Sequence, residues 1–142
     1  MNPSLILRTA TRFLAAMILV FSVYLLLRGH NAPGGGFSGA LVAGTGFALV
    51  AMAEGAGSVR RALRVDPRRL IAWGLGVALS AALVPVFSGN PFFMGIWWKA
   101  TVSGDLEIWI GTPFVFDVGV FFVVLGTILT LMLALEADLE GR

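Results

Sequence analysis

Four long apolar runs constrain this chain more than any other feature of its sequence. Each is long enough, or nearly so, to cross a hydrocarbon core of about 30 Å, which takes roughly 20 helical residues. They cover approximately residues 5–27, 37–53, 70–87 and 114–135. Backbone groups in lipid have no water to bind, so such segments are expected to be helices. The sequence therefore predicts an all-α, polytopic membrane protein with four transmembrane helices, in which residues 1–142 form a single membrane domain.

The composition fits lipid better than water. Hydrophobic residues make up 58% of the 142 positions and charged residues 13%, against about 25% charged residues in a typical soluble domain. The chain has no cysteine and a single histidine, His30. Disulfides and cysteine-based metal sites are thereby excluded, and a histidine-based site is not expected. We expect no metal, no cofactor and no nucleic-acid partner.

The basic residues predict the orientation, because cytoplasmic loops carry an excess of lysine and arginine. Arg8 and Arg12 precede the apolar stretch 13–27 as in a signal peptide, but no small-residue cleavage site follows it. We therefore expect a retained first span. With a cytoplasmic N-terminus, eight of the ten basic residues lie inside and only Arg28 and Lys99 outside, so both termini are expected to be cytoplasmic. Five inner residues form an arginine cluster, which we interpret as a topology determinant, with specific lipid binding as the alternative: Arg60, Arg61, Arg64, Arg68 and Arg69.

Local signals refine these limits. Asp66-Pro67 and Thr112-Pro113 each place an N-cap residue before a proline at the first helical position, which is typical of a helix start. The longest connection is the outer one before the fourth run. Within it, residues 99–110 partly alternate between polar and apolar around the turn-forming residues 103–105, so a short β-hairpin is expected in this loop.

The segment 29–37, with sequence GHNAPGGGF, is the most unusual. Three consecutive glycines before a helix could cradle a phosphate, but a P-loop ends in Gly-Lys-Ser/Thr, and here Phe37 and Ser38 follow. We expect instead that the glycines allow positive φ angles and close helix approach. Gly35, Gly39, Ala43 and Phe47 share one helical stripe, and small residues recur every four positions in 36–44 and 74–82. This spacing brings helices together in lipid, either within the chain or from partners. We interpret these stripes as an indication of a multisubunit assembly.

Asp117 is an acid inside the fourth apolar run, about one turn from its outer end. It could be a proton or cation site, or one member of a polar pair between helices, since intramembrane charges are costly. It could equally be an acid near a helix start, favoured by the helix dipole and wetted from outside. His30, on the same side, is either its partner or a loop residue that forms hydrogen bonds.

No catalytic constellation is visible, so an enzyme is not expected. The sequence has no serine–histidine–acid pattern and no paired carboxylates within a span. Glu54 and Glu136 close the second and fourth runs, and we interpret them as solvated helix ends, with Glu54 facing the arginine cluster.

Two stretches resemble a known family. Residues 28–41, RGHNAPGGGFSGAL, are similar to the signature of the MnhB (also called MrpB) subunits of multisubunit Na⁺/H⁺ antiporters, and residues 112–127, TPFVFDVGVFFVVLGT, resemble the last-helix motif of the same family. Within these stretches, Asp117 and His30 are the candidates for an ion path or a polar pair. The motif and packing positions are Pro33, Gly34, Gly35, Gly36, Phe37, Gly39, Phe116 and Gly119.

The resemblance implies an accessory subunit of the Mrp complex, a hetero-oligomer that exchanges Na⁺ or another monovalent cation for H⁺ across the bacterial cell membrane. Its partners would be the other Mrp subunits and membrane lipids. The subunit would contribute to assembly and to an ion path. The alternative is a structural scaffold subunit of a related membrane-bound hydrogenase-type complex with no direct role in ion conduction.

Overall fold

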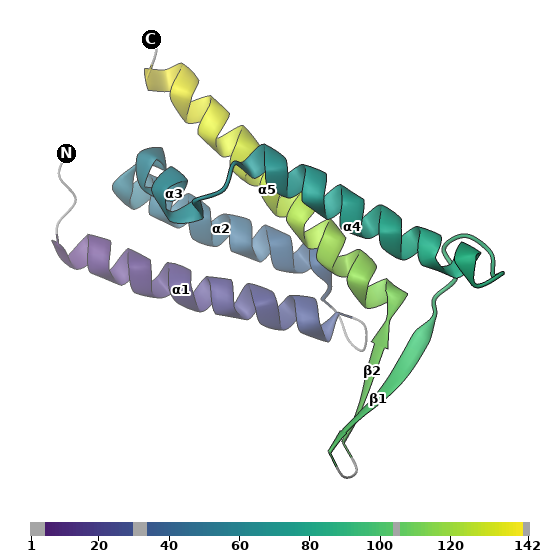
Figure 1. Cartoon of the computed structure of the whole chain (residues 1–142). Helices are drawn as coiled ribbons and strands as arrows, with labels where there is room; N and C mark the ends of the chain where they lie inside the picture. The colour runs from purple at the N-terminus through teal and green to yellow at the C-terminus, as the bar shows by residue number, and fades with distance from the viewer. Residues whose placement is uncertain (1–4, 30–33, 104–105, 141–142) are drawn as a thin grey trace.

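The computed structural model describes residues 5–29, 34–103 and 106–140, which form five helices and one β-hairpin (Figure 1). Four helices are long and apolar enough to cross a membrane, which confirms the expected number of spans. In chain order the elements are α1 (Leu5–Arg28), α2 (Gly36–Glu54), α3 (Ala56–Leu63), α4 (Pro67–Phe87), β1 (Trp97–Ser103), β2 (Leu106–Gly111) and α5 (Thr112–Glu140).

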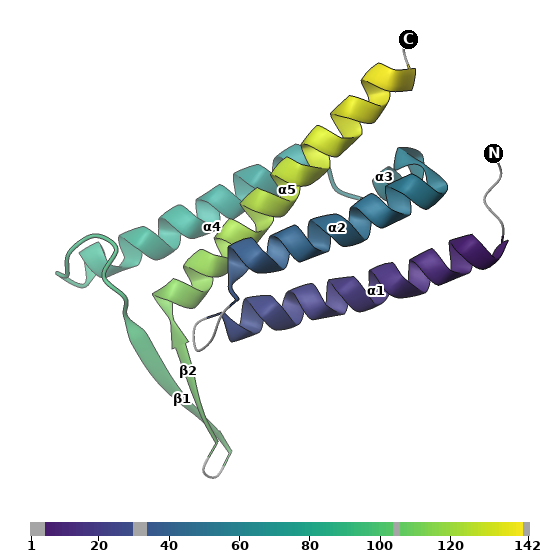
Figure 2. The same ribbon diagram turned by 180° about the vertical axis from the view of Figure 1, so that it is seen from behind.

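The long helices lie in a row in the order α1, α2, α5, α4 (Figures 1 and 2). Helix α5, the last in sequence, packs between α2 and α4, while α1 packs mainly on α2 and α4 mainly on α5. The core therefore follows α2 and α5, and its buried residues are Leu26, Ala40, Ala43, Val59, Phe121, Leu125 and Leu129. The outer helices keep exposed apolar faces, as at Phe13 of α1 and Trp73 of α4.

Glycines allow the helices of this row to approach closely. A Cβ on Gly74 would lie 2.6 Å from the carbonyl oxygen of Gly119, so α4 and α5 touch through their backbones. A Cβ on Gly39 would lie 2.8 Å from the carbonyl oxygen of Ser22 in α1, and one on Gly44 would lie 2.9 Å from Cδ1 of Ile128 in α5. The small-residue stripes thus pack α1, α2, α4 and α5 together within one chain. Because the stripes are used within the chain, they do not by themselves indicate partner subunits. Our interpretation of them as a sign of a multisubunit assembly therefore does not follow.

The two predicted helix starts differ in outcome. Asp66 caps α4 as expected, because its Oδ1 accepts a hydrogen bond of 2.9 Å from the backbone N–H of Arg68. Helix α5 begins at Thr112 itself. The Thr112 hydroxyl accepts from the N–H of Ile96 at 3.1 Å, and the Thr112 N–H donates to the Ile96 carbonyl at 3.0 Å. Thr112 therefore ties the start of α5 to the segment before the hairpin.

The hairpin in the long connection is confirmed and is longer than expected. Strands β1 and β2 pair antiparallel from Trp97 opposite Gly111, with an irregularity between Thr101 and Ser103. The predicted turn at residues 104–105 lies outside the described residues. The hairpin extends past the ends of the helices, on the side away from the two termini (Figure 1).

Candidate functional site

Asp117 is half-buried in α5 and lines a pocket of about 300 Å³ at the hairpin end of the row. The pocket lies between the C-terminal end of α4, the segment after it and the first turns of α5. Its walls are mostly apolar and aromatic, with Phe93, Trp97 and Phe116 among them. Phe93 and Phe116 meet edge to face, with ring centroids 5.6 Å apart. A carboxylate in such surroundings contributes most of the local charge.

The glycine loop sits directly on Asp117. A Cβ on Gly35 would lie 3.0 Å from Oδ2 of Asp117, and a Cβ on Gly36 would lie 1.9 Å from its carbonyl oxygen. Any larger residue at Gly36 would force α2 away from α5. Gly35 also has a φ of 110°, which side chains rarely adopt. The two motifs are thus parts of one contact, although about 80 residues separate them.

A hydrogen bond fixes this loop to α1 as well. The N–H of Gly35 donates to the carbonyl of Leu25 at 3.0 Å, and a Cβ on Gly29 would lie only 2.1 Å from Cα of Gly35. Glycine at both positions lets the chain leave α1 and enter α2 with its backbones in contact. The start of α2 is therefore held between α1 and Asp117.

The Asp117 carboxylate meets the N-terminal end of α2. The first backbone N–H groups of a helix have no partner within the helix and carry a partial positive charge. Helix α2 has no side-chain cap of its own at Gly35. The Asp117 carboxylate lies beside this uncapped start, and among the described residues no hydrogen bond engages it.

The predicted site residues divide into four groups. Asp117, Phe116, Gly35 and Gly36 come together at this site. Gly34 lies beside α1, since its Cβ would be 2.8 Å from the Leu25 carbonyl oxygen, and Gly39 and Gly119 are helix-packing positions. Phe37 is exposed. His30 and Pro33 lie outside the described residues.

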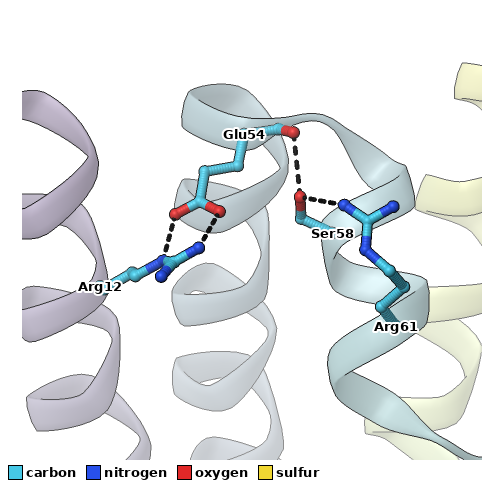
Figure 3. Close-up of polar contacts among 4 residues, drawn as sticks. All are labelled: Arg12, Glu54, Ser58 and Arg61. Carbon is cyan, nitrogen blue, oxygen red and sulfur yellow. Dashed lines mark hydrogen bonds and ion pairs between the residues drawn. The ribbon is translucent and has the colours of Figure 1, made fainter. Parts of the chain in front are cut away.

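A second polar cluster lies at the opposite end of the row, which the sequence did not reveal (Figure 3). The guanidinium of Arg12 in α1 donates two hydrogen bonds to the carboxylate of Glu54 at the end of α2, of 2.6 and 2.8 Å. Arg61 donates to the Ser58 hydroxyl, which in turn donates to the Glu54 carbonyl at 3.1 Å. This cluster connects α1, α2 and α3.

Glu136 also has a role that sequence reasoning missed. One of its carboxylate oxygens accepts a hydrogen bond of 2.7 Å from the backbone N–H of Ala56, the first residue of α3. A residue of α5 thus caps a helix 80 positions earlier in the chain. The interpretation of Glu54 as a solvated helix end was wrong, because its side chain is covered and paired with Arg12, while that of Glu136 did not foresee its role as a cap. Their distance in sequence from Arg12 and Ala56 left no local signal.

The four apolar helices lie in a row, and the glycine loop contacts Asp117. This is the fold of a small polytopic membrane protein with closely packed helices. Residues 6–130 match the family model described as "Domain related to MnhB subunit of Na+/H+ antiporter". The chain belongs to this family, as the two sequence motifs predicted.

Two relatives match along almost their whole length. The chain is 33% identical over 139 residues to the B subunit of the Na(+)/H(+) antiporter of Alkalihalophilus pseudofirmus, which covers 96% of this chain and 95% of that protein. It is 35% identical over 133 residues to the putative antiporter subunit mnhB2 of Staphylococcus aureus, covering 92% of this chain and 93% of that protein.

The fold is also found in a solved structure. A chain of the Mrp complex from Dietzia sp. DQ12-45-1b matches with a TM-score of 0.77 and 35% sequence identity. The match covers 92% of this chain but only 14% of that chain. In that complex the four-helix unit is therefore one part of a much longer polypeptide.

Proposed function

We propose that this chain is an accessory membrane subunit of a multisubunit antiporter that exchanges Na⁺ or another monovalent cation for H⁺. The observation that carries the proposal is the near full-length match to a Na(+)/H(+) antiporter subunit, with the glycine loop and Asp117 in contact as one site. Its partners would be the other subunits of an Mrp-type complex, and its place a bacterial cell membrane with both termini cytoplasmic. The arginine bias supports that orientation.

The geometry supports a contributing role rather than transport by this chain alone. Secondary transporters bind substrate and coupling ion near the bilayer midplane, between repeats or bundles. In this chain Asp117 lies near one end of α5, and its pocket opens at the hairpin side. We infer that Asp117 completes an ion path, or a polar contact, whose other wall comes from a neighbouring subunit.

Deletion of the gene in its native operon tests the proposal. Na⁺/H⁺ exchange is measured in everted membrane vesicles, with and without the wild-type gene supplied in trans. We expect exchange to be lost on deletion and restored by the gene. Unchanged exchange with a complex that still contains its other subunits would contradict the proposal.

A further inference from the structure

A pocket lined by arginines lies at the end of the row opposite Asp117. It has a volume of about 560 Å³ and is formed by the end of α3, the turn into α4 and the C-terminal part of α5. Its charged lining comes from Arg60, Arg64, Arg68 and Asp66. Its apolar lining includes Leu133 and Ala134 of α5.

The charges of this pocket do not cancel. Three arginines and one aspartate line it, which gives the lining a formal charge of +2. Asp66 already uses Oδ1 to cap α4 through the N–H of Arg68. In the part of the chain that the structure describes, the side chains of Arg60, Arg64 and Arg68 have no ion pair or hydrogen bond. The start of α4 adds its own positive dipole end.

The other basic groove of the molecule differs in this respect. It has a volume of about 460 Å³, and Arg12 and Arg61 line it. Arg12 is bound to Glu54 and Arg61 to Ser58. Its two guanidinium groups therefore already have hydrogen-bond partners within the chain. The pocket beside α4 is the better candidate for binding an anion.

The wall of the pocket continues from the arginines along α5 toward the hydrocarbon core of the membrane. Thr130, Leu133, Ala134 and Ala137 line it from one face of α5, at the helical spacing i, i+3, i+4 and i+7. Helix α5 has 29 residues, so it is about 43 Å long, against roughly 30 Å of hydrocarbon. Its ends therefore reach the headgroup layers. The lining from Ala137 to Thr130 descends by about 10 Å from that level.

We propose that this pocket binds one anionic phospholipid, with the headgroup phosphate between the three arginines and an acyl chain along α5. Guanidinium groups recognise phosphate through strong, charge-assisted hydrogen bonds, and basic pockets beside transmembrane helices suit anionic headgroups. The apolar wall distinguishes a lipid from a free phosphate or an acidic peptide, neither of which would use it. This proposal stands independently of the antiporter function.

Native mass spectrometry of the full-length chain, released from micelles with equal amounts of phosphatidylglycerol and phosphatidylcholine, tests it. We expect the wild type to retain phosphatidylglycerol preferentially. Replacing Arg60, Arg64 and Arg68 by glutamine should lower this preference by about tenfold or more, since each basic residue near an anionic headgroup contributes substantially. The matched control replaces Arg8, Arg61 and Arg69 by glutamine, which removes the same charge outside the pocket and should retain most of the preference.

A second pair of variants tests the acyl-chain wall. Ala134→Trp fills the pocket and should reduce lipid retention as strongly as the triple arginine change, while inorganic phosphate binding is unaffected. Leu135→Trp, on an exposed face of α5 at the same depth, should bind lipid as the wild type does. Equal retention of the two lipids by the wild type would overturn the proposal. So would a control that loses as much preference as the pocket variant, or an Ala134→Trp protein that keeps the full preference, which would indicate a site for phosphate or an acidic segment.

Discussion

The carboxylate of Glu54 binds the guanidinium of Arg12 through two parallel hydrogen bonds, Nε to Oε1 at 2.6 Å and Nη2 to Oε2 at 2.8 Å. The pair joins the N-terminal half of α1 to the C-terminal end of α2. The Glu54 side chain is only 4% exposed and that of Arg12 is 65% exposed. The acid is therefore covered by the fold, while the base reaches it from the surface.

Removing the exposed partner of this pair should destabilise the α1–α2 contact. Arg12→Gln leaves the covered Glu54 carboxylate without its bidentate partner, which is costly in an apolar setting. We expect the thermal unfolding midpoint in detergent to fall by several degrees. The double variant Arg12→Gln/Glu54→Gln should recover part of that loss, because no unpaired charge remains. A double variant less stable than Arg12→Gln would contradict this account.

Gly36→Ala should disrupt the contact between α2 and α5. The new Cβ would lie 1.9 Å from the Asp117 carbonyl oxygen, and rigid backbone cannot yield as a side chain can. Overpacking of this kind costs about 1–3 kcal/mol or more. The measurement is thermal unfolding of the purified chain, together with recovery of assembled complex. Gly76→Ala on the exposed face of α4 is the control, because a Cβ there meets nothing within 4 Å, and its stability should be unchanged or slightly raised.

Asp117→Asn should separate assembly from transport. The amide keeps the size of the carboxylate but carries no charge and cannot exchange a proton near neutral pH. We expect the complex to assemble normally and its Na⁺/H⁺ exchange in everted vesicles to fall at least tenfold. Asp138→Asn, at the exposed far end of the same helix, is the control and should exchange as the wild type does. Normal exchange by an assembled Asp117→Asn complex would assign the acid a structural role only.

Glu136→Ala should loosen the start of α3. It removes the acceptor of the 2.7 Å hydrogen bond from the Ala56 N–H, and loss of such a cap costs about 1 kcal/mol. Amide hydrogen exchange in residues 56–59 should accelerate roughly fivefold. Glu136→Gln keeps an oxygen that can accept the same bond, so exchange there should stay near the wild-type rate. Equal acceleration in both variants would show that the charge, not the cap, orders this helix.

The spans were predictable because a helix that crosses lipid must be apolar along nearly its whole length. Length and hydropathy placed the ends of α2 and α4 to within three residues, and the Asp66 cap was found because its partner is two residues away. Helix α3 was missed because it has only eight residues, two of them arginines in its last turn. Gly55, with φ of 82°, turns the chain between α2 and α3. A single glycine in the sequence is not enough to predict such a turn.

Long-range pairings were beyond local reading. The small-residue stripes indicated close helix packing but not which helix each one meets. In the structure the stripes of α2 meet α1 and α5, and the stripe of α4 meets α5. The contact of Gly35 and Gly36 with Asp117 was not predicted from the sequence, which offered only His30 as a partner of Asp117 on the same side. Nothing local in the sequence joins Glu136 to Ala56 or Arg12 to Glu54, because these partners lie 80 and 42 positions apart.

The single-file order α1, α2, α5, α4 has a consequence for how ions could pass. A wall of helices, unlike a barrel, encloses no lumen, and its two broad faces are both outer surfaces. In the ion path that we propose, Asp117 would therefore face a seam between this wall and a neighbour. Selectivity would then be a joint property of two polypeptides, each of which supplies half of the lining.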